Sequence, residues 1–211
     1  MLNLKFYRIL LAIFIITVAG TISAHAQSAD VFFGVGTATD SSSNQQIDTF
    51  GDGNLYSTPK MTGAFGTFGA DFMFRPHFGV GGESTFRFSQ GSYAGLNYRP
   101  NFYDFNAIFL PLANSNRIVP EFQAGLGGAK LNFYYNQQFC DAFAGCSTSN
   151  TYLESSNHFQ LHFAGGLRFY VKGGMFLRPQ IDVHWVHNLF QFGSDFVPQY
   201  SLSIGYTFGR Q

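Results

Sequence analysis

Residues 158–171, HFQLHFAGGLRFYV, alternate strictly between two kinds of side chain. One set is apolar and includes Phe159 and Phe163, whereas the other carries polar residues such as His162 and Arg168. A repeat of two residues indicates a β-strand whose two faces meet different environments. If the polar face meets water, the chain is a soluble sandwich or barrel. If the apolar face meets lipid, it is a transmembrane barrel.

Composition favours lipid. Charged residues make up 11% of the chain, whereas a soluble domain typically carries about 25%. Aromatic residues make up 18%, and 27 residues are Phe. An outer-membrane barrel has few charges and many aromatics, because its outside faces lipid and is bounded by aromatic girdles. The chain has 12 basic and 12 acidic residues, so it lacks the basic excess expected of a nucleic-acid-binding protein.

The first 26 residues are predicted to be a secretory signal peptide. Lys5 and Arg8 give a short basic start, ILLAIFIITVAG follows as an apolar segment, and AHA at 24–26 has the form of a cleavage site. An uncleaved anchor is the alternative, but the apolar run is short for a spanning helix, which needs roughly 20 residues. Residues 27–211 then form one domain. No later stretch is apolar enough for a spanning helix, so any membrane role must come from strands.

The alternating pattern predicts eight strands. Their approximate ranges are 29–39, 62–75, 78–90, 98–110, 118–134, 157–171, 175–189 and 199–209. The connections at 76–78, 111–117 and 172–174 are short, whereas those at 40–61, 91–97, 135–156 and 190–198 are longer. Short turns at one end and longer loops at the other are typical of bacterial outer-membrane barrels. The predicted fold is therefore all-β: a closed antiparallel eight-stranded transmembrane β-barrel, an up-and-down meander with both termini in the periplasm.

The polar faces of these strands carry most of the charged residues. The set is Asp71, Glu83, Arg87, Asp104, Glu121, His162, Arg168, Arg178, Asp182 and His184. The interior of an eight-stranded barrel is just wide enough to be filled by side chains, and a buried charge needs an opposite partner. We therefore predict a salt-bridged polar plug in the lumen. A narrow ion path or gate along the same residues is the alternative.

The long connections contain two groups of candidate ligands. Cys140 and Cys146, in CDAFAGC, are predicted to form a disulfide, because an exported protein meets an oxidising compartment. Asp40, Asp48 and Asp52 in the first loop lack the alternate-residue spacing of a calcium loop. No metal site and no cofactor are predicted.

One further group of residues was considered for catalysis. Some outer-membrane barrels are lipid-modifying enzymes that use a His–Ser pair and a carboxylate, and His187, Ser194 and Asp195 lie near one end of the last two strands. The His-x-Ser pattern of the barrel lipid A deacylases is missing, because position 189 is Leu189. We predict that the protein is not an enzyme.

The predicted strands, their loop pattern and the closing segment YSLSIGYTFGRQ resemble the small eight-stranded outer-membrane barrels of the OmpA transmembrane-domain, OmpX and opacity-protein type. The resemblance covers nearly all of residues 27–211. It implies a bacterial outer-membrane location, with the lipid bilayer and the outer-membrane assembly machinery as partners. The last strand of that family usually ends on a terminal aromatic, whereas here Phe208 is followed by Gly209, Arg210 and Gln211.

The functional prediction is a non-enzymatic outer-membrane protein whose extracellular loops serve surface interaction, adhesion or envelope integrity. Loops 40–61 and 135–156 are the predicted surface for a ligand. Two alternatives remain at this stage. One is a narrow channel or porin-like transporter for ions or small solutes, and the other is a soluble periplasmic lipocalin-like binder with its Phe side chains inside.

Overall fold

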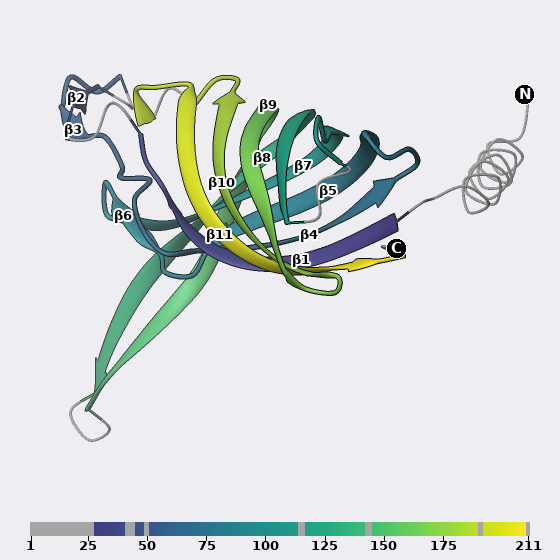
Figure 1. Ribbon diagram of the computed structural model, residues 1–211. Helices are drawn as coiled ribbons and strands as arrows, with labels where there is room; N and C mark the ends of the chain where they lie inside the picture. The colour runs from purple at the N-terminus through teal and green to yellow at the C-terminus, as the bar shows by residue number, and fades with distance from the viewer. Residues whose placement is uncertain are drawn as a thin grey trace, which may run out of the picture.

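The computed structural model shows an antiparallel ring of eight strands (Figure 1). The structure describes residues 28–40, 45–48, 51–113, 117–141, 145–189 and 192–209. The signal peptide predicted at 1–26 therefore lies outside the described residues. Within the described ranges, no helix has the length and apolar character needed to cross a membrane.

Each of the eight strands pairs with two neighbours. Their bounds are β1 Ser28–Ala38, β4 Phe65–Met73, β5 Phe78–Arg87, β7 Leu96–Phe109, β8 Ile118–Asp141, β9 Gly145–Lys172, β10 Met175–Val186 and β11 Phe196–Phe208. Consecutive strands of this set pair in chain order, and β1 pairs with β11 to complete the ring. The predicted eight-stranded antiparallel meander is confirmed.

Three short strands lie in the connections: β2 Gln46–Ile47, β3 Tyr56–Ser57 and β6 Gly91–Tyr93. They lie at the end of the barrel opposite the start of β1 and the end of β11, and this end is called the loop end below (Figure 1). The other end, with the short connections, the start of β1 and the end of β11, is the turn end.

The two faces of each strand differ as the alternation predicts. On β11, Leu202 and Ile204 are about half exposed, whereas Ser201 and Ser203 are buried. The exposed apolar set on the other strands includes Val31, Phe33, Phe68, Phe72, Val80, Phe105, Phe122, Leu126, Phe159, Phe163 and Ile181. A soluble monomer rarely exposes so large a contiguous apolar surface. This arrangement is the opposite of what the lipocalin-like alternative requires, and it places the Phe-rich face toward lipid.

A few large apolar side chains point inward because glycine makes room for them. A Cβ at Gly69 would overlap the ring of Phe32, and a Cβ at Gly205 would overlap the ring of Phe176. Both rings are buried, and each lies against an arginine of the interior. These glycines therefore shape the lumen, as expected for a narrow barrel.

The connection predicted at 135–156 is corrected: it is not a loop. β8 and β9 continue past their other barrel neighbours as a two-stranded hairpin, whose register runs from Tyr135 opposite Thr151 to Asp141 opposite Gly145. This segment projects far beyond the ring (Figure 1). Its polar residues lack the apolar alternation that marks a strand in contact with lipid, so the sequence pattern does not identify it as β-structure.

The connection predicted at 91–97 is also corrected. β6 pairs with the start of β7, from Gly91 opposite Tyr98 to Tyr93 opposite Leu96. Ala94 and Gly95 make the turn with φ values of 47° and 82°. Such left-handed residues are those that a two-residue hairpin turn requires.

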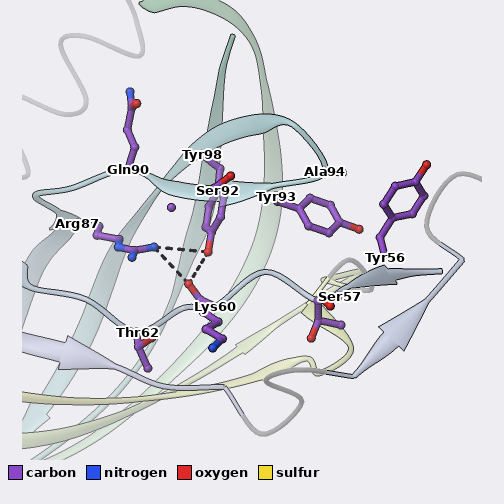
Figure 2. Close-up of a pocket in the computed structure, with 12 residues that line it drawn as sticks. Tyr56, Ser57, Lys60, Thr62, Arg87, Gln90, Ser92, Tyr93, Ala94 and Tyr98 are labelled. Carbon is purple, nitrogen blue, oxygen red and sulfur yellow. Dashed lines mark hydrogen bonds between the residues drawn. The ribbon is translucent and has the colours of Figure 1, made fainter. Parts of the chain in front are cut away.

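Near this turn, the loop end is fastened by contacts with the first connection. The Tyr98 hydroxyl donates a hydrogen bond to the Lys60 carbonyl, and the Arg87 Nη1 donates to the same oxygen at 3.2 Å (Figure 2). The first connection is thereby held against β5 and β7 at this end of the barrel.

Candidate functional site

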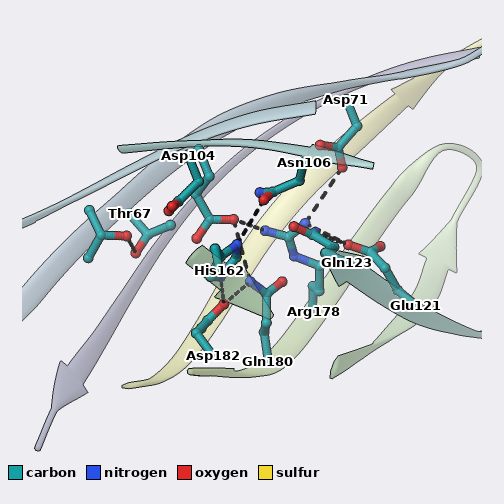
Figure 3. Close-up of polar contacts among 12 residues, drawn as sticks. Thr67, Asp71, Asp104, Asn106, Glu121, Gln123, His162, Arg178, Gln180 and Asp182 are labelled. Atoms are coloured by element: carbon teal, nitrogen blue, oxygen red, sulfur yellow. Dashed lines mark hydrogen bonds and ion pairs between the residues drawn. The ribbon is translucent and has the colours of Figure 1, made fainter. Parts of the chain in front are cut away.

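Two buried arginines lie at the centre of the barrel interior. Arg168 on β9 forms ion pairs with Asp30, with Asp71 at 2.8 Å and with Glu121. Arg178 on β10 forms ion pairs with Glu121 at 3.0 Å, with Glu83 at 3.1 Å and with Asp71 at 3.6 Å (Figure 3). We call these six residues the arginine cluster: Asp30, Asp71, Glu83, Glu121, Arg168 and Arg178.

The arginine cluster links six of the eight strands across the lumen. Asp30 comes from β1, Asp71 from β4, Glu83 from β5 and Glu121 from β8. The two guanidinium groups also lie over inward-pointing rings, Arg178 at 3.7 Å from the centroid of Phe32 and Arg168 at 5.3 Å from that of Phe176. Buried ion pairs with several partners are difficult to separate, because removing one partner leaves an uncompensated charge. The cluster therefore fills and cross-links the interior.

A second polar group lies nearer the loop end. Its members are Asp104, Asn106, Gln160, His162, Gln180, Asp182 and His184, and we call it the histidine cluster. His162 contacts Asn106 Oδ1 at 2.9 Å through Nδ1 and Asp182 Oδ1 at 3.0 Å through Nε2. Gln180 donates to Asp182 and, at 3.4 Å, to Glu83, so the two clusters are continuous. Figure 3 shows this network across the lumen.

The histidine cluster brings together three residues that could serve as metal ligands. Ligand atoms of Asp104, His162 and His184 lie within 4.8 Å of one another. However, the two imidazole rings are stacked, with centroids 4.8 Å apart and planes at 20°. A metal binds in the plane of an imidazole, so stacked rings do not direct their lone pairs at one point. His184 also stacks on Phe102, and the ring arrangement is that of packed side chains.

The structure places the ten predicted lumen residues in two settings. All but Arg87 lie in the arginine and histidine clusters. Arg87 is buried at the loop end, and among the described residues no carboxylate lies within 4 Å of its guanidinium. The expectation that Arg87 belongs to the salt-bridged plug is corrected for this reason.

Several partners in these clusters are not among the ten predicted lumen residues. Asp30 is the most important, because it is 1% exposed and pairs with Arg168. Asp30 shares a face with Phe32 and Gly34, and this face alternates with the apolar residues Val31 and Phe33. The two-residue repeat therefore indicates that Asp30 points into the barrel. The neutral partners Asn106, Gln160 and Gln180 carry no charge signal and are identified only by the pairing of the strands.

Apolar layers close the interior on both sides of the polar clusters. The layer at the loop end consists of Ala38, Met61, Phe65, Tyr93, Tyr98, Phe102, Ala129, Leu131, Val186, Leu189, Phe192 and Val197. The layer at the turn end consists of Met73, Ile108, Leu110 and Val119. Met61, Leu189 and Phe192 come from connections, so parts of these connections pack into the interior at the loop end.

The projecting hairpin carries the disulfide and several exposed rings. Cys140 and Cys146 are bonded to each other and face each other across β8 and β9. Tyr135, Phe139 and Tyr152 are each about half exposed. The base of the hairpin is tied to the connection before β6, because Asn150 Nδ2 donates to Gln90 Oε1 at 2.9 Å.

The acids of the first connection are used in local turns. Asp48 accepts the backbone amides of Asp52 and Gly53 at 3.2 and 3.0 Å. Hydrogen bonds from the side chain and backbone of Asn54 lower the pKa of Asp52, and the hydrogen bond to Asp52 raises the pKa of Tyr56. These carboxylates therefore stabilise the turn between β2 and β3.

The residues considered for catalysis do not converge. Asp195 accepts the backbone amide of Leu189 at 3.2 Å, and the Ser194 hydroxyl contacts the backbone of Phe196. His187 is exposed, and its ring lies 5.9 Å from that of Trp185. His187 is therefore an exposed residue packed beside Trp185.

Comparison with known proteins identifies relatives by fold alone. No family model matches the sequence. No curated protein matches it either.

Several solved structures share the fold. Neisserial surface protein A has a TM-score of 0.53 and 13% identity, over 85% of this chain and 97% of that chain. The attachment invasion locus protein Ail of Yersinia pestis, in complex with the heparin analogue sucrose octasulfate, has a TM-score of 0.51 and 16% identity, over 86% and 98%. A major outer membrane protein from Thermus thermophilus has a TM-score of 0.52 and 11% identity, over 85% and 99%. The chain therefore has the fold of the small eight-stranded outer-membrane β-barrels.

Proposed function

We propose that this protein is a non-enzymatic outer-membrane protein whose barrel is a closed anchor and whose β8–β9 hairpin contacts a partner at the cell surface. In this proposal residues 1–26 are removed as a signal peptide, residues 27–211 form the barrel, and the loop end faces outward. The observation that carries the proposal is the contrast between a packed interior and a hairpin that projects with exposed aromatic side chains.

The interior favours an anchor over a channel. Arg168 and Arg178 are held by carboxylates from four different strands, and neither guanidinium is accessible. An ion path needs polar groups that exchange partners easily with a passing ion. Here each arginine would lose several charge-assisted hydrogen bonds, and the apolar layers at both ends would still have to open.

The hairpin favours recognition. It presents Tyr135, Phe139 and Tyr152 among Ser, Thr, Asn and Gln residues, with few charges. Tyr is effective at binding surfaces because it supplies a large contact area at low entropic cost. The β-ladder and the disulfide hold the two arms in register, which reduces the ordering cost that a flexible loop would incur on binding.

A surface-ligand role also has a parallel among structures of the same fold. The Yersinia pestis protein Ail was solved with a heparin analogue, sucrose octasulfate. That observation concerns Ail, and it makes an immobilised sulfated glycan a suitable first surface to test here.

The test expresses the full chain in the outer membrane of a bacterial host strain that does not adhere by itself. The variant combines Tyr135→Ser, Phe139→Ser and Tyr152→Ser, and the matched control combines Gln137→Ser, Gln138→Ser and Thr148→Ser on the same hairpin. Adherence is measured on an immobilised heparin-type glycan and on an epithelial cell monolayer. We expect adherence above the empty-vector level for the wild type and the control, and its loss in the aromatic variant.

Three results would overturn the proposal. The first is a wild type that adheres no better than the empty vector, and the second is an aromatic variant that adheres as well as the wild type. The third is steady conductance by the folded wild-type barrel in a planar bilayer, which would favour the channel. Folding of each variant is checked by its electrophoretic mobility in SDS with and without boiling.

A further inference from the structure

A pocket of about 540 Å³ opens at the loop end (Figure 2), and none of the three hairpin aromatics is among its lining residues. It lies between the first connection, the β5–β6 connection and the start of β7. The lining residues that matter here are Tyr56, Lys60, Arg87, Gln90, Tyr93 and Tyr98. Its volume lies within the range of sites for small ligands, roughly 300–1,000 Å³.

Arg87 is the unusual member of this lining. Arg87 is 8% exposed, and its hydrogen bonds to the described residues go from Nη1, to the Lys60 carbonyl at 3.2 Å and to the Tyr98 hydroxyl at 3.4 Å. The buried Nε has no partner among the described residues. Unlike Arg168 and Arg178, Arg87 forms no ion pair with any described residue. A buried cation without a counter-charge is costly, so its retention at a pocket indicates a ligand that supplies the missing charge.

Glycines keep space around this guanidinium. A Cβ at Gly63 would overlap Nε, and a Cβ at Gly91 would lie 2.6 Å from Nη1. Any larger residue at either position would displace the Arg87 side chain. The guanidinium therefore occupies a fitted position between two segments of backbone.

One acid of the first connection, Asp40, holds that connection in place. Asp40 accepts the backbone amide of Met61 at 2.7 Å and thereby fixes that connection to the loop-end layer. It makes no ion pair with Arg87. Among the described residues, no carboxylate lies within the 4 Å of the Arg87 guanidinium that an ion pair requires.

The other lining groups are suited to hydroxyl-bearing ligands. Gln90 Oε1 accepts hydrogen bonds from Asn97 and Asn150 at 3.2 and 2.9 Å, so the carbonyl end of this side chain is already engaged. Tyr56 and Tyr93 place rings on one side of the pocket, opposite Arg87 (Figure 2). Lys60 is exposed and adds a second positive charge.

We propose that this pocket binds the anionic group of an acidic sugar, with Arg87 pairing to a carboxylate, phosphate or sulfate. A guanidinium can offer two parallel N–H donors to such a group, which gives directional as well as electrostatic recognition. The tyrosine rings pack against the sugar. The site shares no side chain with the hairpin aromatics, so this proposal and the surface-contact proposal can fail separately.

The first experiment is calorimetric titration of the purified full-length mature barrel in zwitterionic nanodiscs. The probes are glucose 1-phosphate, glucuronic acid and neutral glucose. We expect the charged sugars to bind, glucose not to bind, and affinity to fall as salt is raised, because screening weakens a charge-based contact. The wild type alone can overturn the proposal. It does so if neither charged sugar binds, or if glucose binds as tightly as the charged sugars.

The variants then locate the site. Arg87→Gln is expected to weaken binding of the charged sugars at least tenfold, and Arg87→Lys to weaken it less. Arg75→Gln, which removes an exposed arginine at the turn end, is the matched control and should bind as the wild type does. Unchanged affinity in a folded Arg87→Gln barrel would overturn the assignment. If Arg87→Gln does not fold, Lys60→Gln is measured instead, because the Lys60 side chain is exposed. Lys60→Gln should weaken binding of the charged sugars severalfold, and unchanged affinity would overturn the assignment.

A parallel arm separates two sources of the same chemistry. Nanodiscs with and without a lipid that carries a phosphorylated sugar headgroup are titrated with glucose 1-phosphate. Loss of soluble-sugar binding in the lipid-containing discs identifies a membrane headgroup as the competing occupant. Undiminished binding identifies a free saccharide. Both outcomes support the pocket, and they differ in the origin of its ligand.

Discussion

Arg168 on β9 pairs with Asp30 on β1, although 138 positions separate the two residues in the chain. Neither strand is a neighbour of the other in the ring. The ion pair therefore crosses the lumen, and together with the pairs to Asp71 and Glu121 it joins four strands through one guanidinium. Such a contact can form only when the ring is complete, so it couples closure of the barrel to burial of its charges.

Replacement of Arg168 by Gln should therefore destabilise the barrel strongly. Three carboxylates would lose a buried partner, and breaking a buried ion pair costs about 3–5 kcal/mol. The free energy of unfolding is measured by urea titration in lipid, with cold-SDS mobility as the readout of the folded state. Arg117→Gln, at an exposed position near the turn end, removes the same charge and should change stability little. Equal stability of the two variants would contradict the structural role given to the arginine cluster.

The sequence predicts the eight-stranded ring because alternation survives in every strand. Phe159 and Phe163 face outward and His162 faces inward, and this follows from a period of two without knowledge of the neighbours. The height of a side chain along the barrel axis does not follow in the same way. It depends on the stagger between strands, which local pattern does not reveal. Arg87 is on the predicted face, yet it lies at the loop end, outside the arginine and histidine clusters.

The projecting hairpin shows a second limit of sequence reasoning. Outside the lipid-facing zone, β8 and β9 have no apolar face to bury against a membrane, so residues such as Gln137, Ser149 and Thr151 lose the signal that identifies a strand. The β-structure there comes from a ladder that the barrel strands have already begun. It is supported by cross-strand pairs, including the edge-to-face rings of Tyr134 and Tyr152.

The lipid-facing assignment predicts the effect of a charge on the outside. Phe105 is 70% exposed on β7, between Asp104 and Asn106, which are both buried. Phe105→Arg should destabilise the barrel by about 2–4 kcal/mol in a lipid bilayer, the cost found for a basic residue near the bilayer midplane. Phe105→Leu should be tolerated. The comparison uses urea titration in lipid, and a neutral or stabilising effect of the arginine would indicate that this face meets water.

The disulfide should matter for the hairpin and not for the barrel. Cys140 and Cys146 lie where β8 and β9 pair only with each other, so the double replacement by Ser leaves every barrel contact in place. The unfolding free energy of the barrel should stay the same within error. The hairpin arms should open more often, because a constraint on their unfolded state is removed. Chymotrypsin cleavage after Phe139 or Tyr152, followed by mass spectrometry, should be faster in the double variant and in reduced wild type. A parallel loss of barrel stability would show that the hairpin is part of the folding unit.

The proposed division of the chain at Ala26 leads to a direct test of processing. The basic start, the apolar segment and the small residues Ala24 and Ala26 form a signal-peptide pattern, so the mature protein in the membrane fraction should begin at Gln27. N-terminal sequencing of the heat-modifiable band determines this. Ala24→Leu places a large side chain at the cleavage motif and should leave the precursor uncut, with a larger mass, while Ser28→Ala just beyond the site should be processed normally. A band that begins at Met1 in the wild type would show that the apolar segment is retained as an anchor, and the barrel would then carry an additional membrane attachment at its turn end.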